Sequence, residues 1–356
     1  MDQPQPERRA PGDRRARARR LIAALVVLLL AVATASLAIG ATGTSLSSAL
    51  LGWLRGAAPS PAEALILWDI RAPRTVMGML VGAALAVSGA VLQGLFRNPL
   101  ADPGLIGISA GAALGAISAI VLGGLLPPAL FAVAGAWLVP LAAFAGGLGA
   151  TVLLYRLSTR GGQTSIAVML LAGIALAALA AALSGILIFM ANDAQLRDLT
   201  FWQLGSLSGA TWAKVFAAAP LILAGLLAAP MLARALNALA LGEAAAAHLG
   251  IRVQRMKSMA VVSVAAAVGA AVAVSGGIGF IGIVVPHLLR LAMGPDHRFL
   301  LPAAALFGAS LLLGADMIAR VIVAPAELPI GIVTAILGGP FFLWLLLRNR
   351  TLLEGS

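Results

Sequence analysis

The sequence contains no cysteine and few charged residues. The absence of cysteine from all 356 residues excludes disulfide bonds and metal sites built from thiolates. Charged residues make up 10% of the chain, whereas hydrophobic residues make up 61%. A soluble protein of this length could not bury so much apolar surface in one core. The composition therefore excludes an ordinary soluble protein.

Long apolar stretches fill the chain, and they predict an all-α membrane protein. A helix needs about twenty mostly apolar residues to cross a bilayer. We expect about ten transmembrane helices, near residues 21–40, 74–95, 104–124, 129–154, 165–190, 211–233, 257–275, 280–293, 300–320 and 329–347. The eighth segment is short for a full crossing, so we expect it to be tilted or partly re-entrant.

The net charge of +11 would suggest a nucleic-acid partner in a soluble protein. Here the basic residues lie in a tail and in short loops, so the bilayer is the expected partner and nucleic acid is not. With the N-terminus placed in the cytoplasm, 18 of the 24 Lys and Arg residues fall on the cytoplasmic side. The six on the other side are Arg55, Arg71, Arg74, Arg197, Lys214 and Arg320. This bias predicts ten spans with both termini in the cytoplasm.

The first twenty residues are rich in arginine. We interpret residues 1–20 as a basic cytoplasmic tail close to anionic lipid, and residues 21–356 as a single transmembrane domain. The alternative is a cleaved signal peptide, in which "ATA" at 33–35 would mark the cleavage site. The apolar run is long for a signal peptide, which favours the tail.

A nine-residue apolar phrase occurs twice in the chain. Residues 81–89 read VGAALAVSG and residues 268–276 read VGAAVAVSG, so eight of nine positions agree at an offset of 187. Two further pairs match at this offset, Pro99 with Pro286 and Gly107 with Gly294. The copies fall in helices expected to cross in opposite directions, which predicts an inverted repeat of helices 2–5 and 7–10, as in many transport proteins. Chance similarity between alanine-rich helices is the alternative.

Ionisable residues are nearly absent from the expected membrane core. Asp316 and Arg320 are the clearest exceptions, and they are expected to pair because one helical turn separates them. An ion-coupled carrier or an intramembrane enzyme needs buried acids near the midplane, and the sequence places none there. The histidines, His248, His287 and His297, lack metal-ligand spacing. We therefore expect no metal or cofactor bound by this chain.

Neither lysine lies in a phosphate-binding loop. Such a loop needs a Gly-Lys pair followed by Ser or Thr, whereas Lys214 lies in WAKVF and Lys257 in RMKSM. If transport is driven by ATP, a separate partner ATPase must use the ATP and Mg.

The longest expected cytoplasmic connection between spans is 234–256. Two short helices are expected here, ending at Gly242 and Gly250. The functional interpretation is a coupling segment, residues 238–255, that docks on a partner ATPase. A surface amphipathic linker is the alternative.

Several long motifs resemble one family of transport proteins. They are RAPRTVMGMLVGAALAVSGAVLQGLFRNPLADPGLIGISAGAALGA (71–116), LGEAAAAHLGI (241–251), GFIGIVVPHLLRLAMGPDHRFLLP (279–302), GADMIAR (314–320) and ELPIGIVTAILGGPFFLWLL (327–346). Together they resemble the permeases of bacterial ABC importers for vitamin B12, haem and ferric siderophores, the FecCD/BtuC-type family. The resemblance covers nearly the whole chain after residue 60.

The resemblance implies the type II ABC importer permease architecture in the bacterial inner membrane. Two copies of the permease would surround a central pathway and would bind two cytoplasmic ATPases and a periplasmic substrate-binding protein. The chain itself would be a transport subunit and not an enzyme.

The resemblance also implies roles for three groups of residues. Arg71, Arg74 and Arg320 match arginines that face the binding protein, where they would pair with carboxylates. The alternative is that these arginines anchor the protein at the membrane interface, or that Arg320 pairs only with Asp316. Thr164 and Ser165 match the cytoplasmic gate, and helix capping by a hydroxyl is the alternative. The residues that match the coupling segment are Leu241, Gly242, Glu243, His248, Leu249 and Gly250.

The resemblance favours a bulky metal chelate as the substrate, carried by alternating access. A weakly charged path lined by small residues suits a large ligand better than a small ion. Haem is the first choice, with ferric siderophore and cobalamin as alternatives. An ion-coupled secondary transporter and a receptor or scaffold are the alternatives of another class.

Overall fold

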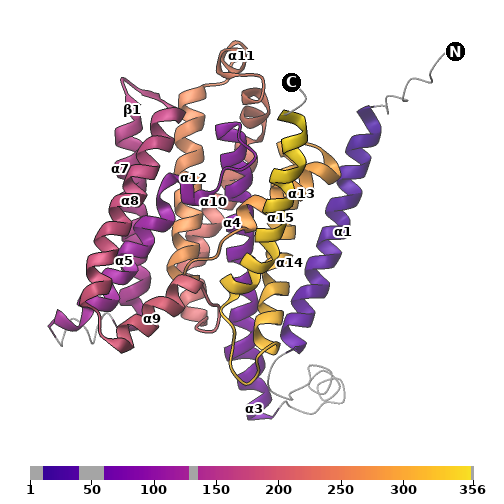
Figure 1. The fold of residues 1–356 in the computed structure, drawn as a ribbon. Helices are drawn as coiled ribbons and strands as arrows, with labels where there is room; N and C mark the ends of the chain where they lie inside the picture. Colours follow the sequence, from indigo (N-terminus) through magenta and orange to yellow (C-terminus); the bar gives the residue numbers. More distant parts are fainter. Residues whose placement is uncertain (1–10, 40–59, 128–134, 354–356) are drawn as a thin grey trace.

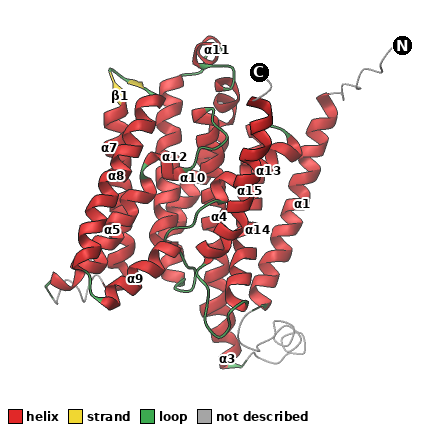
Figure 2. Cartoon of the chain, in the orientation of Figure 1, coloured by secondary structure: helices red, strands yellow, loops and turns green. Residues whose placement is uncertain are grey.

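The computed structural model describes residues 11–39, 60–127 and 135–353, and within these the chain is almost entirely helical (Figures 1 and 2). The strands found there are β1 (Thr159–Arg160) and β2 (Gln163–Thr164), which form one antiparallel hairpin. Arg8, Arg9, Arg55 and the first part of the expected helix at 129–154 lie outside the described residues.

The helices of the described residues follow one another along the chain. They are α1 (Pro11–Ala38), α3 (Pro61–Ala64), η1 (Leu65–Arg71), α4 (Ala72–Phe96), η2 (Pro103–Ile106), α5 (Ile108–Leu122), η3 (Gly123–Leu125), η4 (Gly135–Trp137), α7 (Leu138–Ser158), α8 (Ile166–Met190), α9 (Asp193–Leu204), α10 (Trp212–Leu239), α11 (Glu243–His248), α12 (Val253–Ser275), α13 (Ile281–Met293), α14 (His297–Val321) and α15 (Ile330–Leu353).

Eight helices of the described chain are long and apolar enough to cross a membrane. Two shorter apolar helices, Ile281–Met293 and Ile330–Trp344, occupy the eighth and tenth segments expected from hydropathy. Each of the ten expected segments is therefore helical where it is described, and the expected all-α membrane fold is confirmed.

Several helices begin earlier than expected. α1 starts at Pro11 and so includes part of the arginine-rich tail, because arginine is a good helix former and proline suits the first helical position. The helical run that leads into α4 starts at Pro61, where Ser60 and Glu63 form a capping box. The Ser-x-x-Glu spacing was visible in the sequence but lies outside the apolar run, and hydropathy reports only the apolar part.

The connection 234–256 contains one separate short helix, α11, and not the two that we expected. α10 continues through Leu239 because no glycine or proline occurs between Pro230 and Gly242. Pro286 lies inside α13, although proline usually breaks a regular helix. Neighbouring helices allow proline within membrane helices by satisfying the freed backbone groups.

One polar helix, α9, was missed by the hydropathy pattern. Its sequence is too polar for a membrane span, and a capping box between Asn192 and Gln195 marks its start. α9 lies at the same end of the molecule as α3 (Figure 1).

α4 forms the centre of the fold. It packs against α10, α12, α13 and α14, and nearly all of its residues are buried (Figure 1). Small residues allow this close contact: a Cβ added at Gly89 would collide with the backbone carbonyl of Gly282 on α13. Close backbone approach through small residues is the usual basis of helix packing in lipid.

The two copies of the repeated phrase lie in α4 and α12, which run in opposite directions (Figure 1). Gly107 and Gly294, paired at the same offset, both adopt positive φ, at 73° and 94°. Pro99 and Pro286 differ, because Pro99 follows the end of α4 whereas Pro286 is helical. The antiparallel copies agree with the predicted inverted repeat, whereas the two glycines share only a positive φ, since their ψ values are 0° and 178°.

The molecule has two distinct ends (Figure 1). The α11 end carries α11, the β1–β2 hairpin, the start of α1 and the end of α15. The α3 end carries α3 and α9.

Candidate docking cluster, gate and coupling segment

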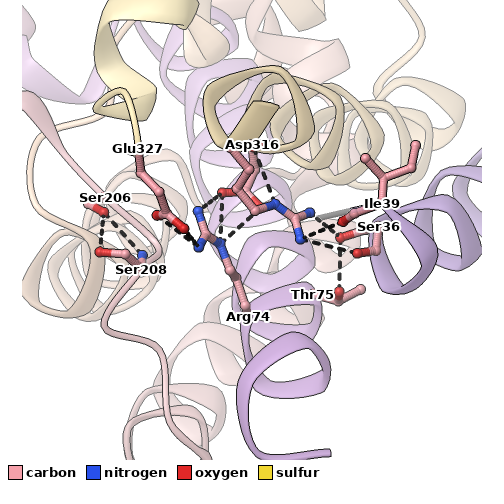
Figure 3. A network of polar contacts seen from close by, with 9 residues as sticks. Ser36, Ile39, Arg74, Thr75, Ser206, Ser208, Asp316 and Glu327 are labelled. Atoms are coloured by element: carbon pink, nitrogen blue, oxygen red, sulfur yellow. Dashed lines mark hydrogen bonds and ion pairs between the residues drawn. The ribbon is translucent and has the colours of Figure 1, made fainter. Parts of the chain in front are cut away.

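At the α3 end, charged side chains from α4, α14 and the loop before α15 meet in one cluster (Figure 3). Arg74 Nη2 lies 2.8 Å from Asp316 Oδ1, and its Nη1 lies 2.8 Å from Glu327 Oε1. Arg320 Nε lies 3.1 Å from Asp316 Oδ2, which confirms the expected pair one turn apart on α14. Asp316 is 0% exposed, and both arginines are buried. One carboxylate therefore holds two guanidinium groups inside the protein.

Arg320 and Arg71 also hold the end of α1. Arg320 donates to the backbone oxygens of Ser36 and Ile39, each at 3.2 Å, and to Ser36 Oγ at 2.9 Å. Arg71 Nη1 donates to the oxygens of Leu37 and Ala38, at 2.8 and 3.1 Å. The last carbonyls of a helix lack partners within the helix and attract cations. The cluster thus fastens α1 to α4 and α14.

The structure places Arg71, Arg74 and Arg320 at the same end of the fold, around the end of α1 and Asp316. All three are buried in the single chain and bind groups of the same chain. Glu327 and Ser36 also belong to the cluster, and neither was predicted from the sequence. Glu327 opens the quoted ELPIG motif, which was the available signal, whereas nothing near Ser36 marked it.

At the α11 end, the β1–β2 hairpin carries the predicted gate. Gly161 and Gly162 form its loop with φ of 56° and 75°, the positive values that a tight two-residue type I′ turn requires. Thr164 is buried, and its Oγ1 lies 2.9 Å from Thr159 Oγ1 across the hairpin. Ser165 Oγ accepts from Val168 N at 3.4 Å, so this residue also caps α8. Capping and a gate are compatible roles for Ser165.

The predicted coupling segment is a compact turn around α11. Gly242 and Gly250 flank the helix with φ of 105° and 78°. Leu241 and Leu249 are exposed, and Glu243 and His248 lie at the two ends of α11. Exposed leucines on either side of a short helix form a surface suited to a protein partner.

Lys257, in the second turn of α12, connects the gate to the coupling segment. Its Nζ donates to the Thr164 backbone oxygen at 2.9 Å and lies 2.8 Å from Glu243 Oε1. From the sequence, this lysine was known only as a basic residue on the cytoplasmic side that lies outside any phosphate-binding loop. Its partners lie 93 and 14 residues away in the chain, so no local pattern pointed to them.

Two short motifs, RNPLADP (97–103) and GPDHR (294–298), lead into helices at the α11 end. Asp102 accepts from Gly104 N at 2.8 Å at the start of η2, and burial raises the pKa of its carboxyl. Asp296 Oδ1 accepts from Arg298 N at 3.0 Å at the start of α14 and from Asn237 Nδ2 at 2.7 Å. Among the described residues no three His, Asp or Glu side chains gather as they would around a metal ion. Both motifs position helices.

The long apolar helices, the inverted repeat and the polar sites at opposite ends define a multi-span membrane transport protein. Residues 25–348 match the FecCD transport family. The chain belongs to that family and is the permease subunit of an ATP-binding-cassette importer, as its relatives are.

Two curated relatives are similar over most of their length. The hemin transport system permease protein HmuU of Yersinia pestis is 46% identical over 336 residues, which cover 94% of this chain and 98% of the relative. The vitamin B12 import system permease protein BtuC of Klebsiella pneumoniae is 46% identical over 293 residues, which cover 80% and 83%.

Two solved structures share the fold. One, described as an inward-facing conformation of a metal-chelate type ABC transporter, has a TM-score of 0.81 at 31% identity and covers 93% of this chain and 99% of its own. The other, PsaBC from Streptococcus pneumoniae, has a TM-score of 0.52 at 19% identity, covers 79% of this chain and 92% of its own, and is similar in fold alone.

Proposed function

We propose that this permease imports haem, a bulky iron chelate, from the periplasm to the cytoplasm by alternating access. The observation that carries the proposal is the 46% identity to the hemin permease over 98% of that protein. The vitamin B12 permease is equally identical over a smaller share, 83%, so cobalamin is the second candidate. Ferric siderophore remains a third candidate within the same chelate class. Membership of an ATP-driven family disfavours the ion-coupled alternative.

We propose that the working complex contains two copies of the permease, two ATPases and a periplasmic binding protein. The ATPases would use ATP and Mg, and this chain would bind no cofactor. The α11 end would face the cytoplasm, and so would both termini. Support comes from the positive charge assigned to that side and from the coupling segment, which lies there. Residues 1–20 would serve as the basic anchor, and residues 11–20 of this anchor belong to α1.

Reconstituted uptake tests the substrate. The permease, its ATPase and its cognate binding protein are placed in proteoliposomes, and ATP-dependent uptake of haem, cobalamin and a ferric siderophore is compared. We expect haem uptake to exceed the others by about tenfold or more, because one or two well-placed contacts discriminate by that factor. Uptake of cobalamin or siderophore in place of haem would overturn the substrate, and uptake without ATP would overturn the class.

We propose that the binding protein docks at the α3 end, over Arg71, Arg74 and Arg320. Glu327 is the accessible member of the cluster, with 37% of its side chain exposed, whereas Asp316 is enclosed. A carboxylate on the binding protein could therefore compete with Glu327 for Arg74 without disturbing the pair with Asp316. On docking, a carboxylate of the binding protein would replace that of Glu327 on Arg74, whose guanidinium is already oriented by Asp316.

Two kinds of substitution test docking. Reversing charge in Arg71→Glu/Arg74→Glu should weaken binding-protein affinity by about tenfold or more, because charged contacts at an interface contribute at least ~1.4 kcal/mol. Glu327→Gln should preserve or tighten binding, because it frees part of Arg74. Arg197→Glu, an exposed arginine of α9, is the matched control. Affinity would be measured by titration of the binding protein on folded complex, and unchanged affinity for the double variant, or weaker binding for Glu327→Gln, would refute this docking.

We propose that ATP binding and hydrolysis in the partner move the coupling segment, residues 238–255, and that this movement opens and closes a gate at Thr164 and Ser165. Leu241, Gly242, Glu243, His248, Leu249 and Gly250 would form the contact with the ATPase. The support is geometric: the hairpin and α11 lie at the same end, and Lys257 bonds to both.

A further inference from the structure

We propose that Lys257 is the positioning residue that transmits movement of the coupling segment to the gate. This inference rests on the proposed function and adds a residue that neither the motifs nor the relatives' names assign. Lys257 is 2% exposed, and its Nζ lies between the Thr164 backbone oxygen and the Glu243 carboxylate. A lysine that only sets membrane topology would keep its ammonium group in water.

The gate hairpin is attached to one face of α12. Gln254 and Lys257 are three residues apart and so lie on the same side of that helix. Gln254 Oε1 accepts from Thr164 N at 2.8 Å, and Lys257 Nζ donates to Thr164 O at 2.9 Å. Both backbone polar groups of Thr164 are thus bonded to α12. One helical turn beyond Gln254, Ser258 Oγ lies 2.5 Å from Tyr155 Oη of α7, which leads into the hairpin.

The attachment of α11 to Lys257 differs from that of the hairpin. Glu243 is the first residue of α11, and its side chain is 40% exposed, whereas Thr164 and Lys257 are buried. The Glu243 carboxylate can therefore move with α11 while remaining in contact with water. The ammonium group of Lys257 cannot lose Glu243 in its buried position without a large penalty, because an unpaired buried charge is costly.

Because Glu243 is partly exposed whereas Lys257 and Thr164 are buried, we infer that movement passes from α11 to the hairpin. When α11 moves relative to α12, Lys257 must follow Glu243 or exchange it for water, and either change alters its bond to Thr164. Thr164 begins the connection to α8 through Ser165, so the altered bond changes the position of the hairpin. Movement at the ATPase surface is thereby linked to the gate by one side chain.

The absence of cysteine makes a direct test practical, since a single Gln163→Cys substitution gives one labelling site per copy in the exposed part of the hairpin. A spin label at this site reports the distance between the hairpins of the two copies in the reconstituted complex. We expect ATP binding to change this distance with Lys257 present. With Lys257→Met the change should be largely lost, while the partner ATPase still hydrolyses ATP.

The second readout is the amount of substrate taken up per ATP hydrolysed. The substrate is haem, cobalamin or ferric siderophore, whichever the wild-type complex imports. Lys257→Met should lower this ratio by about tenfold, within the usual range of coupling between two sites. Lys257→Arg should restore most of it, because a guanidinium can also donate to both partners. Lys214→Met, which changes the only other lysine, at the α3 end, should leave the ratio unchanged.

Glu243→Gln keeps the buried lysine and is the variant to use if Lys257→Met does not fold. It should reduce the hairpin movement in the same direction, and the double variant should be no worse than Lys257→Met alone, because the two residues act as a pair. Normal hairpin movement and normal coupling in both single variants would overturn the inference while leaving the importer assignment intact. A wild-type complex without ATP-dependent uptake would instead overturn the proposed function.

Discussion

Replacing Asp316 with alanine is expected to destabilise the protein by about 3–5 kcal/mol, because it leaves two buried guanidinium groups without their shared carboxylate. Asp316 is 0% exposed and lies 2.8 Å from Arg74 and 3.1 Å from Arg320. Without it the two cations face each other, and α14 loses its bond to α4. The bonds from Arg320 to the end of α1 would loosen as a consequence.

The measurement is the thermal unfolding midpoint of the purified permease in lipid nanodiscs. Asp316→Asn keeps the size of the side chain and an acceptor oxygen, so it isolates the contribution of the charge. Glu327→Gln removes the more exposed carboxylate of the same cluster and should cost less than about 1 kcal/mol, as exposed ion pairs do. Equal shifts of the unfolding midpoint in Asp316→Ala and Glu327→Gln would show that burial does not determine how much each carboxylate stabilises the protein.

Gly89→Ala is expected to destabilise the protein by about 1–3 kcal/mol, the usual cost of overpacking a tight contact. The new methyl group would meet the backbone carbonyl of Gly282, which also accepts a hydrogen bond from Gln93 Nε2 at 3.0 Å. A carbonyl held in this way cannot rotate aside as a flexible side chain would. α4 and α13 would have to separate, in the centre of the bundle.

Gly149→Ala in α7 is the matched control. It makes the same chemical change within a membrane-length helix, but a Cβ at Gly149 has nothing within 4 Å. Alanine is favoured over glycine in a helix interior by about 1 kcal/mol, so Gly149→Ala should be neutral or stabilising. Unfolding midpoints of the two variants, measured side by side, give the comparison. A similar response of both would contradict a packing role for Gly89.

Much of the fold was predictable from the sequence. The ten apolar segments were expected and are helical where the structure describes them, because hydropathy depends on neighbouring residues alone. Their ends were less accurate: the capping box of Ser60 and Glu63 and the arginines at the start of α1 extend helices beyond the apolar runs. α9 was missed because a polar helix gives no membrane-span signal.

The candidate site was predictable only where partners are close in sequence. Asp316 and Arg320 are one turn apart, and their pair was expected and found. Arg74 joins the same carboxylate from 242 residues away, and no periodicity could indicate that contact. The roles of the three arginines in docking, and of Thr164 and Ser165 in gating, stay predictions that follow from the family.

The sequence alone determined the class of the protein: a cysteine-free, weakly charged chain with ten apolar segments and long family motifs is a membrane permease. Only the tertiary structure decided which polar groups share an environment. It enclosed Asp316 between two arginines and placed Lys257 between Thr164 and Glu243. The reason is physical, since a helix forms from local interactions, whereas a buried charge is stabilised by whichever groups the packed helices bring to it.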